Sequence, residues 1–528
     1  MADPSPLLCQ SHSRTDDQES SDQRSHKQSI SSLDEIVEQG IGGFGWAQFV
    51  QAILVSLASL FDSQQSFINV YTEAEPTWHC LNNTTCSSAS NICMLPKSSW
   101  AWDGNPTTTA LTIISEWGLE CSSAFIKGLP AASHFTGRLL GIVFLATLAD
   151  SSLGRKNLLF LSCLTMSVAT SLTIFSNNLW IYSLLRFFSG ISRTTIGTCT
   201  IVLLTEKVGT EWRGQEGILD SFFFTIGTLT LPAIAYTNRS SSWRIIYLWT
   251  SIPTLVYSGL LYIFVSESPR WLFMQGRREE AVEVIKSLSP IRDSNQLSLS
   301  LVSAVSFRHE PAASSKESSF LSSIRELFVR RWALERTLAL MVLGFGIGVV
   351  YYGVTLGIGN LGFDIYLGVV FNALLEIPSF FLTFFLIQKW NRKSSLLVLF
   401  IISGICSIMA VVANDISNAG KRMRIGLELA SLFSAYIAYT VIFIYAIELF
   451  PTCVRNSATS IMRLAITFAT IFSSVLVAAG SNNEFVSYGV FGLVIICCGF
   501  FVICLPETRG SSLCDTMDQQ EHKDSVTV

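Results

Sequence analysis

The sequence predicts an all-α polytopic membrane protein, with twelve transmembrane helices in two similar six-helix bundles. Of the 528 residues, 49% are hydrophobic and only 14% are charged, which leaves too few charged side chains to cover a water-soluble surface. Apolar runs of about 20 residues, the length that crosses a hydrocarbon core, recur along the chain. The third observation is an internal repeat, whose unit is far too long for a solenoid and is typical of membrane transporters.

The repeat consists of polar segments that interrupt the apolar runs at matching places. Segments 206–213 and 448–455 each run from Glu to Arg, and both ends are offset by 242 positions, since 448 minus 206 equals 455 minus 213. A second pair, Glu-Ser-Pro-Arg at 267–270 and Glu-Thr-Arg-Gly at 507–510, ends two other apolar runs with an offset of 240 (507 minus 267). The chain is therefore expected to contain two similar halves.

Each expected span is an apolar run bounded by polar or turn-forming residues. The second run is the least regular, because Lys127, His134 and Arg138 interrupt it. Ionisable side chains inside a span cost several kcal/mol unless they face a partner or a wet cavity. In chain order, the spans are expected near 46–70, 122–148, 157–176, 179–205, 216–237, 243–265, 335–357, 363–388, 394–413, 424–449, 457–480 and 485–505.

The polar segments define the expected topology. The first 40 residues are rich in Ser, Gln, Asp and His and have almost no apolar pattern, which predicts a disordered tail. Lys and Arg concentrate in the loops on the same side as that tail, so both termini are expected in the cytoplasm. The expected division is a tail at 1–40, a first bundle at 41–265, a cytoplasmic linker at 266–334 with helical stretches at 277–288 and 319–331, a second bundle at 335–508 and a tail at 509–528.

The loop after the first span, about 72–121, is expected on the non-cytoplasmic side. It contains two overlapping glycosylation sequons, at Asn82 and Asn83. An oxidising compartment favours disulfides over free thiols, although three pairings of the four loop cysteines stay open. The disulfide candidates are Cys80, Cys86, Cys93 and Cys121.

Several motifs resemble those of the major facilitator superfamily. Asp150 followed by Gly154-Arg155-Lys156 resembles its signature loop, and 389–393 resembles a weaker second copy. More selective motifs are similar to the organic cation and carnitine transporters, and the large first loop resembles that of the plant members. These motifs are Tyr351-Tyr352-Gly353, Asn360-Leu361-Gly362, Glu376-Ile377-Pro378, Glu448-Leu449-Phe450-Pro451-Thr452, Val454-Arg455-Asn456 and Leu505-Pro506-Glu507-Thr508. The resemblance covers about 40–510 and implies a major facilitator fold that moves small organic cations or zwitterions by alternating access.

The resemblance also implies an inner gate, built from charged residues at helix ends that hold the bundles together when the cavity faces outward. Arg186 resembles part of a fourth-span motif and is expected to pair toward Glu206 or Glu267. The alternative is ordinary flanking charge that sets the topology. The expected gate residues are Asp150, Arg155, Arg186, Glu206, Arg213, Glu267, Arg270, Glu448 and Arg455.

Three residues are expected to line the substrate site. Glu376 resembles the acid in the eighth span of organic cation carriers and is suited to attract a quaternary ammonium group; the alternative is a pair with an arginine. Tyr352 offers a ring face to a cation, with lipid or helix packing as the alternative. Asp62, in the first span, supports a hypothesis of proton coupling, with a helix-packing hydrogen bond as the alternative.

The ligand class is left open by a departure from the animal members. About three helical turns after the Arg-Asn pair, the animal cation carriers have an acidic residue and the animal anion carriers have a basic one. In this chain the pair is Arg455-Asn456, the corresponding position is Thr467, and Arg463 lies one turn earlier. An organic anion transporter therefore remains an alternative, as does a sugar–proton symporter, although the seventh span lacks paired amides. A non-transporting receptor is a third alternative.

Other classes are disfavoured by missing motifs. The chain has no phosphate-binding glycine loop, metal-spaced His/Cys set or nucleophile motif, so no enzyme, no cofactor and no metal are expected. The expected partners are a small organic ion, membrane lipid and, in the coupled case, protons; no nucleic acid is expected, and the chain is expected to be a monomer. Asp3 followed by Leu7-Leu8 resembles a sorting signal that favours the vacuolar membrane, with the plasma membrane as the alternative.

Overall fold

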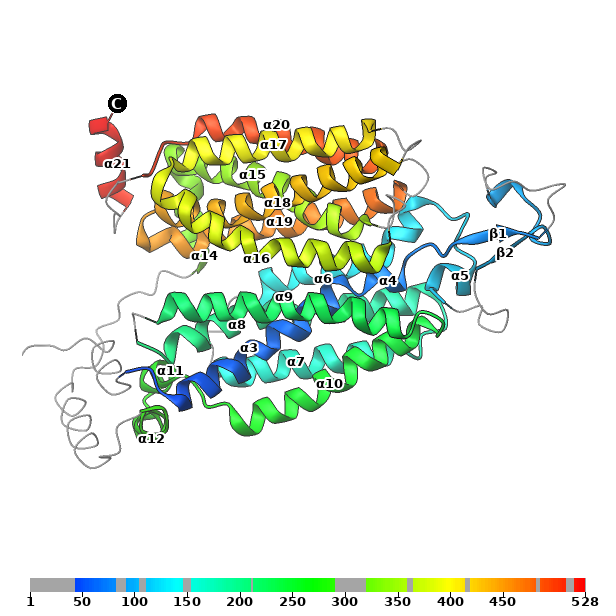
Figure 1. The fold of residues 1–528 in the computed structure, drawn as a ribbon. Helices are drawn as coiled ribbons and strands as arrows, with labels where there is room; N and C mark the ends of the chain where they lie inside the picture. Colours follow the sequence, from blue (N-terminus) through cyan, green and yellow to red (C-terminus); the bar gives the residue numbers. More distant parts are fainter. Residues whose placement is uncertain are drawn as a thin grey trace, which may run out of the picture.

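The computed structural model describes residues 43–81, 92–103, 111–145, 153–209, 212–289, 320–358, 364–413, 418–480, 485–509 and 517–527. In these residues the two halves of the chain form two helical bundles that lie side by side (Figure 1). Each bundle contains six long helical segments, as the sequence predicted. The N-terminal tail, Asp3 and the dileucine lie outside the described residues.

The helix bounds follow the predicted spans closely. The first bundle contains α3 (Trp46–Phe67, continued by α4, Asn69–Thr72), α6 (Ala124–Leu145), α7 (Arg155–Thr173), α8 (Leu179–Glu206), α9 (Arg213–Thr237) and α10 (Trp243–Phe264). The second contains α15 (Arg331–Leu356), α16 (Ile365–Lys389), α17 (Arg392–Val412), α18 (Asn418–Leu449), α19 (Thr452–Ala479) and a last span of η4 (Phe485–Gly489), α20 (Val490–Gly499) and η5 (Phe500–Cys504).

The shorter elements gather at the two ends of the bundles (Figure 1). At one end, here called the linker end, lie α11 (Pro269–Met274), α12 (Arg278–Leu288), α14 (Phe320–Val329) and α21 (Met517–Thr527). At the other, the loop end, lie η1 (Ile92–Met94), α5 (Ile113–Trp117) and an antiparallel pair, β1 (Trp78–Cys80) and β2 (Trp100–Trp102).

The loop end contains the predicted cysteine cluster. A disulfide joins Cys93 to Cys121. Cys80 is also disulfide-bonded. Cys86 and the sequon residues Asn82 and Asn83 lie outside the described residues.

Nine of the described helices are long and apolar enough to cross a membrane on composition alone. The remaining long helices, α3, α6 and α7, contain more polar side chains. These side chains point into the protein: Asp62 and Gln65 of α3 are 7% and 1% exposed, and Lys127 and His134 of α6 are 8% and 0% exposed. Burial inside the bundle lets these spans carry polar groups that lipid would penalise.

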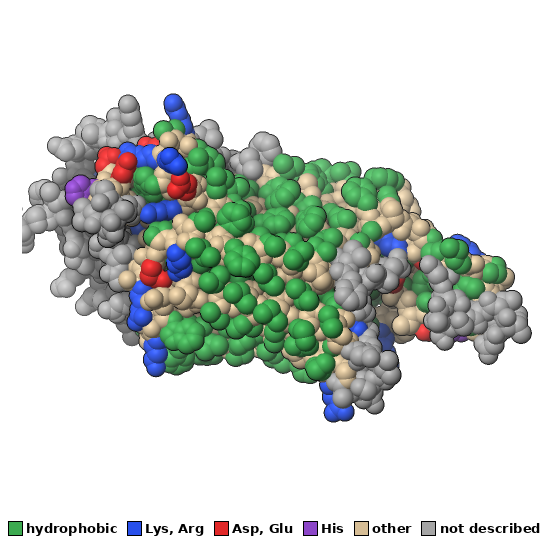
Figure 2. All heavy atoms as spheres, turned by 90° about the horizontal axis from the view of Figure 1, so that it is seen from above, with side chains coloured by type: hydrophobic (Ala, Val, Ile, Leu, Met, Phe, Trp, Pro, Cys, Tyr) green, Lys and Arg blue, Asp and Glu red, His purple; other side chains and the backbone are tan. Residues whose placement is uncertain are grey.

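The surface between the two ends is apolar. Figure 2 shows one face, where hydrophobic side chains form a broad band and charged side chains gather toward the linker end. Exposed Trp249, Phe264, Phe381 and Phe384 belong to this type of surface. Such a band suits contact with lipid tails, since every long helix keeps its backbone hydrogen bonds internal.

The bundles touch through α6 against α19 and α9 against α16. Gly128 makes the first contact close, because a Cβ atom there would lie only 3.1 Å from the Ser474 carbonyl oxygen. Small residues at such positions let helix backbones approach without a hydrophobic driving force.

Candidate functional site

The central candidate site is built on two adjacent tyrosines of α15, Tyr351 and Tyr352, both of which are buried between the bundles. The Tyr351 hydroxyl donates to Glu376 Oε1 on α16 at 3.3 Å, and Thr225 Oγ1 on α9 donates to Glu376 Oε2 at 2.9 Å. Thr225 belongs to the first bundle and Glu376 to the second. The carboxylate therefore lies at the seam between them.

Aromatic rings surround the tyrosine pair. The ring of Tyr351 lies 5.0 Å from that of Tyr436 and 4.9 Å from that of Tyr439, measured between centroids. Phe67 and Phe135 of the first bundle contact Tyr352 at 6.3 and 5.7 Å. Faces of this kind attract organic cations through the ring quadrupole.

A basic group lies on the other side of the pair. Arg138 Nη1 on α6 donates to the Tyr352 hydroxyl at 3.1 Å. Arg463 on α19 lies over the Phe443 ring at 5.2 Å from the centroid. Thr467, at the place where animal members carry a charge, donates back to the Arg463 carbonyl at 2.9 Å. The site thus has an acid that contacts one of the two tyrosines and a base that contacts the other.

Asp62 forms an ion pair with an arginine of the same bundle. Its Oδ1 accepts from Arg193 Nε at 2.6 Å, and both side chains are at least 90% buried. Asp220, a further acid on α9, accepts from Ser59 at 2.5 Å. Asp62 and Arg193 are 131 positions apart, and nothing in that spacing predicts that they pair.

Charged residues at the linker end of the first bundle form a compact cluster. Glu267 caps α7, because Oε1 accepts from the backbone N–H groups of Arg155 and Lys156, each at 3.1 Å. Gly154 has φ of +83°, and a Cβ there would lie 2.3 Å from Glu267 Oε2, so the capping carboxylate requires glycine at that position. Arg155 Nε also lies 3.9 Å from Glu206 Oε2.

The second bundle repeats this cluster. Glu507 caps α17 by accepting from the backbone N–H groups of Arg392 and Lys393 at 2.9 and 3.0 Å. Arg392 pairs with Glu448 at 3.0 Å, and Thr508 donates to the same carboxylate at 2.6 Å. The repeated polar segments of the sequence therefore perform the same two tasks in each half.

The chain matches the family described as "Sugar (and other) transporter" over residues 43–518. It is 50% identical to the Arabidopsis thaliana protein named organic cation/carnitine transporter 2, with 95% of this chain and 96% of that protein covered. It is 52% identical to organic cation/carnitine transporter 3 of the same plant, with 93% and 94% covered. The chain belongs to the organic cation/carnitine transporter family.

Solved structures agree on the fold of this organic cation/carnitine transporter family member. The xylose transporter of E. coli in its inward-open conformation superposes with a TM-score of 0.61 at 15% identity, covering 91% of this chain and 99% of that one. The D-xylose–proton symporter structure gives the same TM-score at 16% identity, covering 88% and 99%. The fold is that of the major facilitator superfamily, as the sequence predicted.

The expected pairing of Arg186 in this family member needs correction. Arg186 does not pair with Glu206 or Glu267; it lies nearer the loop end of α8, where its Nη1 donates to the Gln65 carbonyl at 3.2 Å. Glu206 ends the same helix, too many turns away to reach. Glu448 pairs with Arg392, which the sequence marked only as part of a weaker signature copy.

The structure describes the remaining gate residues in less detail. Arg270 lies in the first turn of α11 and Arg455 in the first turn of α19, both at the linker end. Arg213 begins α9, and its side chain lies outside the description, as does the whole of Asp150. Two ion pairs between long helices at this end, Arg155 with Glu206 and Arg392 with Glu448, each join helices of one bundle.

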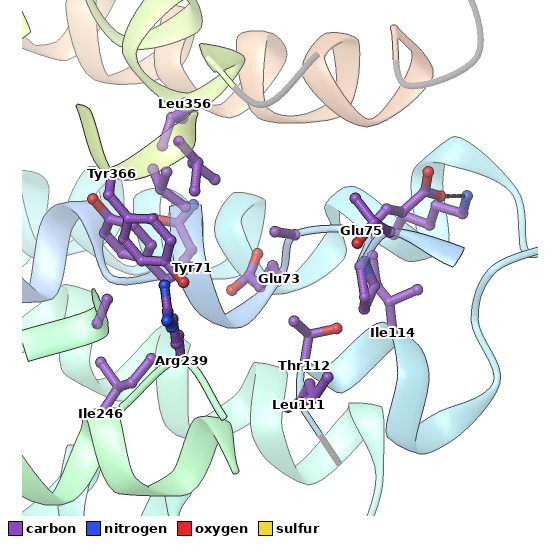
Figure 3. Close-up of a pocket in the computed structure, with 18 of the residues that line it drawn as sticks. Tyr71, Glu73, Glu75, Leu111, Thr112, Ile114, Arg239, Ile246, Leu356 and Tyr366 are labelled. Carbon is purple, nitrogen blue, oxygen red and sulfur yellow. Dashed lines mark hydrogen bonds and ion pairs between the residues drawn. The ribbon is translucent and has the colours of Figure 1, made fainter. Parts of the chain in front are cut away.

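The loop end is closed between the bundles by aromatic side chains. Tyr71 of α4 stacks on Tyr366 of α16 with centroids 5.5 Å apart and an interplanar angle of 15°. Tyr236 of α9 packs edge-on against Tyr366 at 5.4 Å. Figure 3 shows the stacked pair beside Leu356.

Proposed function

We propose that this protein carries small organic cations and zwitterions, carnitine among them, across a membrane by alternating access. The observation that carries the proposal is the Glu376 carboxylate at the bundle seam. Its side-chain hydrogen-bond partners in the described part of the chain are the neutral hydroxyls of Thr225 and Tyr351, and within the described residues no basic side chain lies within 4 Å of it. A carboxylate without a cationic partner, next to tyrosine rings, suits a cationic substrate.

The base on the other side of the tyrosines extends the proposal to zwitterions. Arg138 contacts the Tyr352 hydroxyl, while Glu376 contacts the hydroxyl of the neighbouring Tyr351. A molecule with an ammonium group at one end and a carboxylate at the other therefore meets the opposite charge at each end. The names of the Arabidopsis relatives, which include both organic cations and carnitine, support the same class.

Uptake measurements test the substrate class. Cells that express the chain are given labelled tetraethylammonium, carnitine, p-aminohippurate as an organic anion, and glucose. Uptake of tetraethylammonium and carnitine is expected. Glu376→Gln should lower it by about tenfold or more, because a neutral amide does not attract the cationic group of the substrate as a carboxylate does. Uptake of glucose or of the anion alone would replace the proposal with one of the alternatives.

Sugar–proton symport remains the second candidate, because the family description and the xylose transporter fold support it. Proton coupling belongs to either substrate class and is proposed for Asp62 with its partner Arg193. A carboxyl that exchanges a proton as the arginine moves away would link proton and substrate movement. Asp62→Asn should then transport at a rate that no longer depends on external pH; unchanged pH dependence would exclude Asp62 as the coupling group.

We also propose the vacuolar membrane as the site of action, with both termini in the cytoplasm. The support is the acid–dileucine sequence at Asp3 and Leu7-Leu8, together with the Lys and Arg bias of the linker-end loops. A fluorescent fusion should mark the vacuole, and Leu7→Ala with Leu8→Ala should move it to the plasma membrane. A fusion that marks the plasma membrane in both forms would contradict this placement.

A further inference from the structure

A cavity lies at the loop end. Its volume is about 870 Å³, which is within the range of small-molecule sites. We call it the loop-end vestibule; both bundles and the loop line it, and Tyr71, Tyr366 and Leu356 lie together on one side of it (Figure 3). Glu376 and Tyr352 do not line it, so it is separate from the central site.

Two buried polar groups of the vestibule wall have no hydrogen-bond partner among the described residues. They are the Tyr71 hydroxyl and Asn69 Oδ1, in side chains that are each 6% exposed. Leaving such groups unpaired in a buried position costs about 1–3 kcal/mol each. Both residues line the cavity.

Glu73 adds a negative charge next to them. Its Oε1 accepts from the Tyr182 hydroxyl at 3.2 Å, and within the described residues no basic nitrogen lies within 4 Å of its carboxylate. Figure 3 shows the Glu73 side chain in the cavity, on the segment that follows Tyr71. Asn69, Tyr71 and Glu73 alternate along this one short segment.

The whole vestibule has more acids than bases. Its lining contains the acids Glu73, Glu75, Asp103 and Asp364 and the bases Lys127 and Arg239. Lys127 is paired with Glu75. The Arg239 guanidinium lies over the Tyr236 ring, 4.8 Å from its centroid. A lining of this composition attracts cations and repels anions.

We propose that the loop-end vestibule is a second binding site for a small organic cation, with Glu73 as its counter-charge and the rings of Tyr71, Tyr366 and Trp78 as its walls. The ligand class is that of the proposed function, but binding in the vestibule does not depend on transport or on Glu376. A cation held here waits outside the Tyr71–Tyr366 closure and is next to the central site when that closure opens.

The ionisation of Glu73 gives the site a pH response. Burial raises the pKa of Glu73 to about 7, against the opposing influence of Arg186 and the hydrogen bond from Tyr182. Tyr247 on α10 and Tyr182 and Arg186 on α8 face the same region, and their side chains do not titrate near neutral pH. The carboxylate that attracts the cation is present above pH 7 and is lost as the pH falls below it, so binding should weaken in that direction.

Equilibrium binding of labelled tetraethylammonium to the full-length protein in nanodiscs tests the proposal. The unmodified protein should bind two equivalents, Glu73→Gln and Glu376→Gln one each, and the double variant none. Glu73→Gln should weaken the vestibule site by about tenfold, and Tyr71→Phe by a smaller factor while keeping the ring stack. Glu279→Gln, a remote exposed acid on α12, is the matched control and should bind as the unmodified protein does.

The outcomes separate the two proposals. If one equivalent binds and Glu376→Gln alone removes it, the vestibule site does not exist, while the transport proposal stands. If one equivalent binds and only Glu73→Gln removes it, the vestibule proposal holds and the central site of the proposed function fails. Thermal melting of each variant shows whether a loss reflects unfolding, and Tyr71→Phe provides an independent readout in a variant that removes no charge.

Discussion

Glu376 shows how far single residues could be assigned from the sequence. Its resemblance to the acid of organic cation carriers marked the position, and the structure places it at the seam between the bundles. The hydroxyl that holds it from the first bundle belongs to Thr225, 151 positions away. No local pattern links two residues at that distance, so the partner required the fold.

In the sequence, Arg138 and Arg193 are simply charged residues inside apolar spans. A charge in a span predicts a partner or a wet cavity but does not say which. The structure distinguishes them: Arg193 pairs with Asp62, whereas the side-chain contact of Arg138 in the described residues is the neutral Tyr352 hydroxyl. Arg138 is therefore the base available to a bound carboxylate.

Replacing Arg138 tests the zwitterion hypothesis. Arg138→Gln should raise KM for carnitine by about tenfold, because the substrate carboxylate loses a charge-assisted contact. Uptake of tetraethylammonium, which has no carboxylate, should change little. Side-by-side uptake of the two labelled substrates measures the difference, and equal losses for both would show that Arg138 supports the fold and not the selectivity.

At the scale of helices, the two capping acids have the same role in each half. Glu267 accepts hydrogen bonds from backbone N–H groups in the first turn of α7, and Glu507 does the same in the first turn of α17. An acid at a helix N-terminus satisfies unpaired N–H groups and favours the helix dipole, which together contribute about 1 kcal/mol. In each bundle the acid follows the sixth span and caps the third, so it connects helices that are distant in sequence.

Most helix bounds could be predicted from the sequence, and the departures have a physical cause. The predicted span at 424–449 is a helix from Asn418, because Lys421, Arg422 and Arg424 continue α18 beyond the apolar run. Hydropathy marks the part of a helix that lies in lipid, whereas the helix itself continues for as long as its backbone hydrogen bonds do. The same reason extends α15 to begin at Arg331.

The linker-end ion pairs should affect transport rate more than assembly. Arg155→Ala and Glu448→Ala each remove one partner of a partly buried pair. Uptake should slow by about three- to tenfold, equal to roughly 0.7–1.4 kcal/mol in the rate-limiting step, while the protein still reaches the membrane. Initial uptake rates normalised to surface protein measure this.

Glu335→Ala is the matched control for these variants, because Glu335 forms only an exposed pair with Arg331 one turn away. Such pairs contribute little. Normal uptake in both Arg155→Ala and Glu448→Ala would show that these ion pairs do not act as a gate. A Glu448→Arg exchange combined with Arg392→Glu should recover part of the lost rate if the pair itself is what matters.

At the scale of the whole molecule, side-chain contacts in the middle and at the loop end join the two bundles. They include Thr225 with Glu376, Arg138 with Tyr352 and Tyr71 with Tyr366. Alternating access requires the last of these to separate while the linker end closes. The fold class could be predicted because the internal repeat and the hydropathy pattern are visible in the sequence. Which end of the bundles is closed could not be predicted, because it depends on contacts between residues that are distant in sequence.

Locking the aromatic closure should stop transport. In the double variant Tyr71→Cys with Tyr366→Cys, a short bifunctional thiol reagent is expected to link α4 to α16 and abolish uptake, because the bundles then cannot part at the loop end. The reducible form of the linker should restore uptake when reductant is added. The unmodified chain and each single variant receive the same treatment, and continued uptake by the linked protein would contradict rocking at this contact.

The polar character of α3, α6 and α7 has a consequence for biosynthesis. These three spans precede the other nine along the chain, and among the described long helices they are the ones that fall outside the set apolar enough to cross a membrane alone. A translocon releases segments into lipid according to their hydrophobicity, so the opening third of this chain is poorly suited to stay there unaided. Stable integration of the early helices is therefore expected to wait for the synthesis of α8, α9 and α10, whose faces shield the buried acids and bases from lipid.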